Sequence, residues 1–192
     1  MKPSTPASDT TVTTHVSRRS ALGALATAAI APFAAGVGSH VAPVQAQQGA
    51  APTAPIGPLR ADALPAGVRS RFVDNVNGLR MHVLEAGYEA PGRPGLLLIH
   101  GYPELAYSWR KLMPPLAAAG YHVFAPDVRG YGRTTPSPVA YTDDLRPFGS
   151  LNKIKDMLAL VSAMGHRSVA VFGHDQGSPL AGWCACARPD VF

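Results

Sequence analysis

One five-residue turn limits most strongly what this chain can fold into. The apolar residues 169–172 run directly into Gly173-His174-Asp175-Gln176-Gly177, and a segment with Pro179 near its start follows. This order predicts a strand, a sharp turn and a helix. Glycine suits both ends of such a turn, because a Cβ atom there is expected to collide with the neighbouring strand or helix. The turn therefore predicts that Asp175 is lifted clear of a sheet, beside the start of a helix.

Apolar strands and amphipathic helices alternate along residues 96–187. Residues 96–99 and 122–125 are two further apolar runs that suit buried strands. Two helical stripes are expected, ending at Gly120 and Gly165. Their members are Trp109, Leu112, Met113 and Leu116, then Leu151, Ile154, Leu158 and Val161. This alternation predicts an α/β fold, a mostly parallel sheet flanked by helices. Residues 71–74 and 80–85, separated by Asn75-Val76-Asn77-Gly78, predict a hairpin that adds an antiparallel edge.

The first 68 residues are expected to lie outside this domain. Residues 1–46 combine Arg18-Arg19, an alanine-rich apolar stretch and small residues near Ala46, which resembles a twin-arginine signal of bacteria. We expect cleavage there and a periplasmic or secreted product. A membrane anchor is the alternative, but the stretch contains Pro32 and is shorter than the ~20 apolar residues of a span. No stable membrane insertion is therefore expected after cleavage. Residues 47–68 are expected to form a mobile linker, and residues 69–192 the folded domain.

Charge and cysteine content exclude several classes of function. The formal net charge is +5, and the first 46 residues hold three basic and one acidic side chain, which leaves +3 for the remainder. That remainder has no Lys/Arg run, so a nucleic-acid partner is not expected. Cys184 and Cys186 lie two apart on an expected helix, a spacing that is unsuitable for a mutual disulfide. Two cysteines are also too few for a structural zinc site. No metal, nucleotide or redox cofactor is expected, and the expected partner is a small-molecule substrate.

A second motif follows the first apolar run, and a third follows the second. They are His100-Gly101-Tyr102-Pro103-Glu104 and Asp127-Val128-Arg129-Gly130-Tyr131-Gly132-Arg133. Ligands of parallel sheets bind at the carboxyl ends of the strands, where all three motifs are expected to meet. In hydrolases that have such a glycine-flanked turn after one strand and a loop motif after another, backbone N–H groups of the two motifs stabilise negative charge on an oxygen of the reacting group. Here these would be the N–H groups of Tyr102 and Gln176.

Together the three motifs resemble the epoxide hydrolase and haloalkane/haloacetate dehalogenase branch of the α/β-hydrolase superfamily, over residues 71–192. The resemblance implies that Asp175 is the nucleophile and that Tyr102 and Gln176 provide the oxyanion N–H groups. The supporting motif residues are His100, Gly101, Pro103, Gly173, His174 and Gly177. In the family the lid, the remaining strands, the triad acid and the histidine follow in the chain, so this sequence is expected to be truncated before them and inactive alone. A fragment of a longer enzyme is the preferred hypothesis, and a natural, catalytically inactive truncated product is the alternative.

An aspartate nucleophile changes the expected reaction. A carboxylate is suited to displacement at an sp³ carbon, which forms an ester on Asp175 that water then hydrolyses. Epoxide hydrolysis to a diol is favoured, and a haloacid or haloalkane dehalogenase is the alternative. Many members of the branch carry tryptophan where this chain has Gln176, and loss of an indole halide donor weakens the haloalkane hypothesis more. The position of Glu104 directly after Tyr102-Pro103 also resembles the loop motif of epoxide hydrolases. A serine esterase is disfavoured, since Ser178 is not at the apex of the turn.

Each candidate residue also has a plain structural interpretation. Asp175 could cap the following helix, but a cap needs neither the flanking glycines nor the second motif. For His100 and His174 we prefer packing and loop support to a role as catalytic base, because in this fold the base follows the nucleophile along the chain. Asp127 and Arg129 are expected to hold their own loop.

Overall fold

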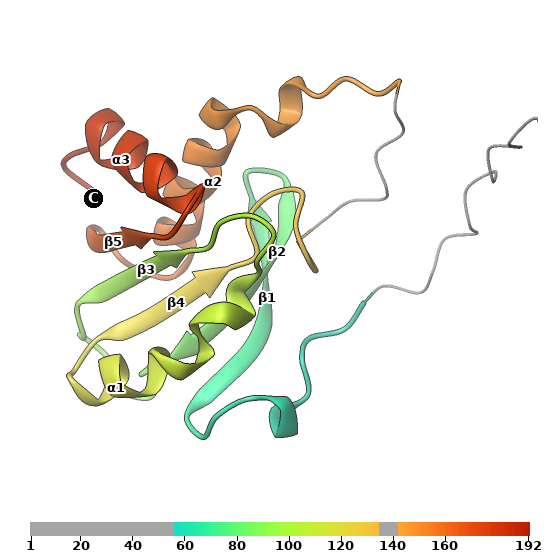
Figure 1. Ribbon diagram of the computed structural model, residues 1–192. Helices are drawn as coiled ribbons and strands as arrows, with labels where there is room; N and C mark the ends of the chain where they lie inside the picture. The colour runs from blue at the N-terminus through green and yellow to red at the C-terminus, as the bar shows by residue number, and fades with distance from the viewer. Residues whose placement is uncertain (1–55, 135–141) are drawn as a thin grey trace, which may run out of the picture. The chain divides into compact units, whose positions relative to one another are not determined.

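The computed structural model describes residues 56–134 and 142–192 (Figure 1). The expected signal, residues 1–46, and residues 47–55 of the expected linker lie outside these residues. Within the described part, no helix combines the length and the apolar character needed to cross a membrane.

Five strands form one mixed sheet in the order β1-β2-β4-β3-β5 (Figure 1). Their bounds are β1 Val68–Val76, β2 Leu79–Ala86, β3 Gly95–Ile99, β4 His122–Pro126 and β5 Val169–Gly173. The β1–β2 hairpin joins β4 in antiparallel fashion, whereas β3 pairs in parallel with both β4 and β5. The expected parallel sheet with an antiparallel hairpin at its edge is therefore confirmed.

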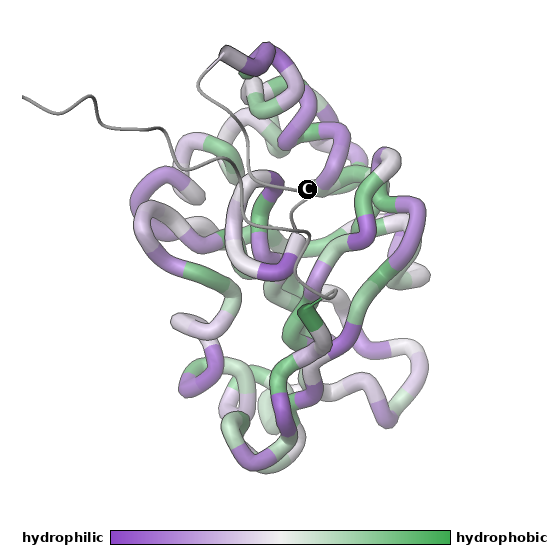
Figure 2. The backbone as a smooth tube through the Cα atoms, turned by 90° about the vertical axis from the view of Figure 1, so that its right-hand side faces the viewer, coloured by the Kyte–Doolittle hydropathy of each residue, from purple (hydrophilic) through white to green (hydrophobic). Residues whose placement is uncertain are grey.

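Helices cover both faces of this sheet. Their bounds are η1 Ala61–Ala63, η2 Ala106–Lys111, α1 Met113–Ala118, η3 Arg146–Phe148, α2 Ser150–Ala163 and α3 Gly177–Ala187. The helices α2 and α3 pack with Leu97 and Ile99 in one core cluster, while η2 and α1 pack with Leu98 in the other. Alternate residues of β3 thus face opposite layers, as the pleat of a strand requires. Because both layers are apolar, β3 is hydrophobic along nearly its whole length. Figure 2 shows hydrophobic and hydrophilic stretches along the backbone of the domain.

Both predicted helical stripes need correction. Leu112 is 52% exposed, because the segment is not one helix but η2 followed by α1. Two prolines, at 114 and 115, suit the first turn of a new helix and lack the N–H groups that a continuous helix uses. On α2 the predicted stripe is only partly right. Val161 is buried and Ile154 packs against the core, but Leu151 is 66% exposed, and Asp156, Met157 and Leu160 are buried although they lie outside the predicted stripe.

The described part of the expected linker is not free of the domain. Leu59 and Leu64 pack against the cluster that contains Leu98, and the Leu59 N–H donates to Ser70 Oγ at 2.8 Å. Strand β1 then begins at Val68, earlier than the expected hairpin. Two isolated leucines in a proline-rich stretch show no period, so the sequence could not reveal this packing.

Candidate active site

Asp175 lies at the apex of the turn between β5 and α3. Its φ of +50° is a left-handed conformation that is unusual for a residue other than glycine. A Cβ atom at Gly173 would lie 2.1 Å from the Gly177 carbonyl oxygen, and one at Gly177 would lie 2.2 Å from that of Ile99. Both glycines are therefore required by close backbone contacts, as the sequence predicted.

The turn directs the Asp175 carboxylate to the neighbouring loop. The backbone N–H of Tyr102 donates to Asp175 Oδ1 at 2.8 Å. This bond, and to a lesser degree the backbone N–H of Gln176, favours the charged carboxylate and lowers the pKa of Asp175 below its ordinary value. The side chain is otherwise exposed, so it presents an ionised carboxylate to solvent at neutral pH.

The loop of residues 100–105 lies tightly against this turn. A Cβ atom at Gly101 would lie 2.5 Å from Asp175 Cβ, so only glycine allows the approach. The Tyr102-Pro103 peptide bond is cis, and the Glu104 N–H donates to the Gly101 carbonyl at 3.0 Å. The loop thus forms its own turn around the N–H group that reaches Asp175.

The two histidines of the motifs differ in their surroundings. His100 is buried, its Nδ1 donates to the Gly101 carbonyl at 2.9 Å, and its Nε2 accepts from the Val128 N–H at 3.0 Å. Burial lowers the pKa of His100, which favours the neutral ring that these contacts need. His174 is 58% exposed and lies with Nδ1 3.5 Å from Glu104 Oε2. The ring of His100 thus links its own loop to the Val128 N–H after β4.

A small pocket of about 190 Å³ adjoins the turn. It is lined by His100, Gly101, Val128, Tyr131, Ser150, Lys153, Gln176, Pro179, Leu180 and Trp183. The Tyr131 hydroxyl donates to Gln176 Oε1 at 3.4 Å. The sequence analysis named Tyr131 only as a member of the third motif and did not single out Lys153 or Trp183, because these two belong to separate helical segments that meet the motifs only in the fold.

The cysteines and acidic groups carry no further site in residues 56–134 and 142–192. Cys184 is buried and Cys186 is exposed, and neither forms a disulfide. In that part of the chain, no group of three or more His, Cys, Asp or Glu side chains converges as metal ligands would.

Comparisons with known proteins agree with this geometry. A family model described as alpha/beta hydrolase fold matches residues 94–192. The chain is 44% identical over 108 residues to epoxide hydrolase A of Mycobacterium tuberculosis, covering 56% of this chain and 31% of that protein. It is 38% identical over 116 residues to an epoxide hydrolase of Caballeronia sordidicola, covering 60% and 32%.

Solved structures give the same result. An epoxide hydrolase from an endophytic Streptomyces aligns with a TM-score of 0.58 and 44% identity, over 67% of this chain and 36% of that one. The Vigna radiata epoxide hydrolase VrEH1 aligns with a TM-score of 0.56 and 34% identity, over 65% and 37%. The chain spans about a third of the length of the Mycobacterium tuberculosis and Caballeronia sordidicola proteins, and a similar share of the two solved structures.

Proposed function

The chain belongs to the α/β-hydrolase-fold family, in its epoxide hydrolase-like part, and on that premise we propose that Asp175 is the nucleophile of an epoxide-opening hydrolase. The observation that carries the proposal is the 2.8 Å hydrogen bond from the Tyr102 N–H to Asp175 Oδ1. A carboxylate held by backbone donors at the apex of a strand–turn–helix is suited to attack carbon and then to pass through an ester intermediate.

The first step is displacement at an epoxide carbon. The Asp175 oxygen not bound by Tyr102 attacks the carbon in line, and the carbon–oxygen bond of the ring breaks. The released alkoxide takes a proton from a solvent water, which leaves as hydroxide, and an ester remains on Asp175. The pKa of Asp175 is lowered from its ordinary value, so the nucleophile is ionised at neutral pH and also at mildly acidic pH. This supports attack by a carboxylate without prior loss of a proton.

The second step is hydrolysis of that ester. Water attacks the ester carbonyl carbon, and negative charge develops on the oxygen that faces the N–H groups of Tyr102 and Gln176. Donors already aimed at this oxygen stabilise the charge without reorganisation. Collapse of the intermediate releases the diol and regenerates the carboxylate. One pair of N–H groups therefore serves both the resting carboxylate and the oxyanion.

We further propose that the 192-residue chain alone forms this ester but does not turn over. The second step needs a general base for water. In the branch that the chain resembles, this base is a histidine that follows the nucleophile along the chain, whereas His100 and His174 both precede Asp175. Both ring nitrogens of His100 are moreover bonded to backbone groups. The ester is therefore expected to accumulate rather than to hydrolyse.

Mass spectrometry of the intact chain tests the proposal. After incubation with styrene oxide we expect an adduct of one epoxide mass on the peptide that contains Asp175. The Asp175→Asn variant should stay unlabelled, while Asp74→Asn, at a carboxylate with a 73% exposed side chain, should be labelled like the parent chain. Label on other carboxylates alone would overturn the proposal. Label from bromoacetate but not from the epoxide would favour halide displacement instead.

Export of the protein is a separate proposal. We propose that residues 1–46 are removed during twin-arginine-type export, which the Arg18-Arg19 pair and the small residues near Ala46 support. The N-terminal sequence of the mature protein from the source organism tests it. A start near Gln47 is expected, and an intact Met1 in the exported fraction would contradict cleavage.

A further inference from the structure

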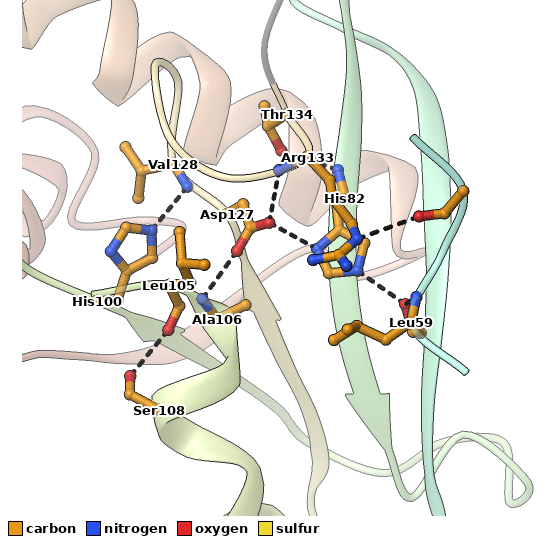
Figure 3. Close-up of polar contacts among 12 residues, drawn as sticks. Leu59, His82, His100, Leu105, Ala106, Ser108, Asp127, Val128, Arg133 and Thr134 are labelled. Atoms are coloured by element: carbon orange, nitrogen blue, oxygen red, sulfur yellow. Dashed lines mark hydrogen bonds and ion pairs between the residues drawn. The ribbon is translucent and has the colours of Figure 1, made fainter. Parts of the chain in front are cut away.

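A buried carboxylate, Asp127, lies behind the active-site loop at the end of β4. It is 1% exposed and accepts three hydrogen bonds (Figure 3). The Ala106 N–H donates to Oδ1 at 2.9 Å, the Arg133 N–H to Oδ2 at 2.9 Å, and His82 Nδ1 to Oδ2 at 2.8 Å. Burial alone raises the pKa of Asp127, but these donors outweigh it and lower the pKa below its ordinary value. Asp127 is therefore an ionised acceptor that ties several backbone segments together.

His82 orders this carboxylate from the other side. Its ring is 1% exposed and its Nε2 lies 2.7 Å from Ser70 Oγ, which also accepts the Leu59 N–H. Because an ionised carboxylate only accepts, Nδ1 must carry the proton, and in the neutral ring Nε2 then accepts from the Ser70 hydroxyl. From Leu59 through Ser70 and His82, each donor is directed toward Asp127. This chain of hydrogen bonds fixes a single tautomer and a single ring orientation of His82.

A serine, a histidine and an aspartate in contact also suggest a second nucleophile. The surroundings argue against it. His82 and Asp127 are buried, and the Ser70 oxygen is occupied by the Leu59 N–H. Ser70 is also not among the residues that line the pocket beside the Asp175 turn. The group is better explained by what it holds in place.

What it holds is the loop that carries the Tyr102 N–H. A hydrogen bond holds each end of this loop, and these two bonds are the ties of the loop. At one end the Val128 N–H donates to His100, and at the other the Ala106 N–H donates to Asp127. Both ties come from adjacent residues at the end of β4. Tyr102 lies between them, and a turn within the loop shortens the span further. The position of its N–H relative to Asp175 is thereby set by the end of β4.

We propose that Asp127 and His82 are positioning residues that hold the Tyr102 N–H against Asp175. The catalytic consequence rests on the proposed function, whereas the positioning itself does not. Asp127→Asn should loosen the Ala106 tie, because its NH₂ group faces the Arg133 and His82 donors in one orientation of the amide and the Ala106 N–H in the other. His82→Leu removes one donor, and His82→Asn restores an N–H close to the position of Nδ1.

The first measurement is the ¹H–¹⁵N spectrum of the 192-residue chain. In the parent chain the Tyr102 amide proton should appear far downfield, as expected for a hydrogen bond to a carboxylate. Asp127→Asn and His82→Leu should move it upfield, and His82→Asn should recover part of the shift. Glu85→Gln is the matched control, because Glu85 is a carboxylate 2% exposed on β2 that pairs with Phe124 of β4 and contacts His122 at the start of that strand. It should leave this resonance unchanged. A folded Asp127→Asn variant with the parent Tyr102 shift would overturn the proposal.

The second measurement is the pH dependence of Asp175 labelling. Since the Tyr102 N–H lowers the pKa of Asp175, losing its alignment should raise the pH midpoint of ester formation toward the ordinary carboxyl value. An unchanged midpoint in folded Asp127→Asn contradicts positioning. A parent chain that is never labelled contradicts the proposed function instead, and the Tyr102 resonance still decides the positioning role.

Discussion

The backbone N–H of Tyr102 lies 2.8 Å from Asp175 Oδ1, although 73 residues separate the two in sequence. The contact follows from strand pairing. Strands β3 and β5 are parallel neighbours with Ile99 opposite Gly173, so each strand delivers its motif to the same edge of the sheet. The His174 N–H continues the pairing by donating to the Ile99 carbonyl at 3.1 Å. Two local motifs thus become one site through the register of two strands.

Substitution of Gly177 tests how closely the two motifs approach. A Cβ atom there would lie 2.2 Å from the Ile99 oxygen and 2.8 Å from the His100 oxygen, both backbone atoms that cannot rotate away. Gly177→Ala should lower the free energy of unfolding by about 2 kcal/mol or more. A Cβ atom at Gly182, also on α3, would meet no atom within 4 Å, so Gly182→Ala should stabilise the helix by up to ~1 kcal/mol. Urea unfolding of both variants measures the contrast, and equal effects would contradict it.

The predictable parts of this molecule are those that local sequence determines. Apolar runs and glycine-flanked turns indicated the strands and the Asp175 turn, because their signals span only a few residues. The buried charges were not predictable. Asp156 lies outside the predicted apolar stripe of its helix, yet it is buried, since Asn77, 79 residues away, and Arg129 provide its hydrogen bonds. Burial of a charge depends on such distant partners.

The backbone at Asp175 is expected to hold strain that function requires. With φ at +50°, any residue with a Cβ atom is disfavoured there, whereas glycine is not. Asp175→Gly and Asp175→Ala both remove the carboxylate, so their difference isolates the backbone effect. The glycine variant should melt roughly 5 °C higher than the alanine variant. Thermal unfolding at one pH measures this, and an alanine variant at least as stable would show that the turn is unstrained.

Glu85 should make stability depend on acid pH. Burial on its own raises the pKa of Glu85, but hydrogen bonds from His122, Arg71 and Arg69 lower it to about 2. A carboxyl whose pKa is lowered on folding contributes stability above its unfolded value near 4.5, and this contribution is lost as the pH falls toward 2. The shift corresponds to about 3 kcal/mol.

Chemical unfolding between pH 6 and pH 2 measures this contribution. The parent chain should lose stability steadily below about pH 4.5, the ordinary value for Glu85. Glu85→Gln should be less stable at pH 6 and show a shallower decline, since its side chain does not titrate. Parallel curves for the two proteins would mean that Glu85 is not the group responsible.

Removing the carboxylate from the buried pair of Asp156 and Arg129 should lower the free energy of unfolding far more than removing it from an exposed pair. Asp156 is fully buried and accepts from Arg129 at 2.6 and 2.8 Å and from Asn77 at 2.7 Å. Asp156→Ala leaves a guanidinium whose side chain is only 12% exposed without its partner, which should cost about 3–5 kcal/mol of unfolding free energy. The matched control is Asp144→Ala. Its partner Arg146 has a 90% exposed side chain, so water replaces the lost contact and no measurable change is expected. Similar losses in the two variants would show that burial does not set the strength of these pairs.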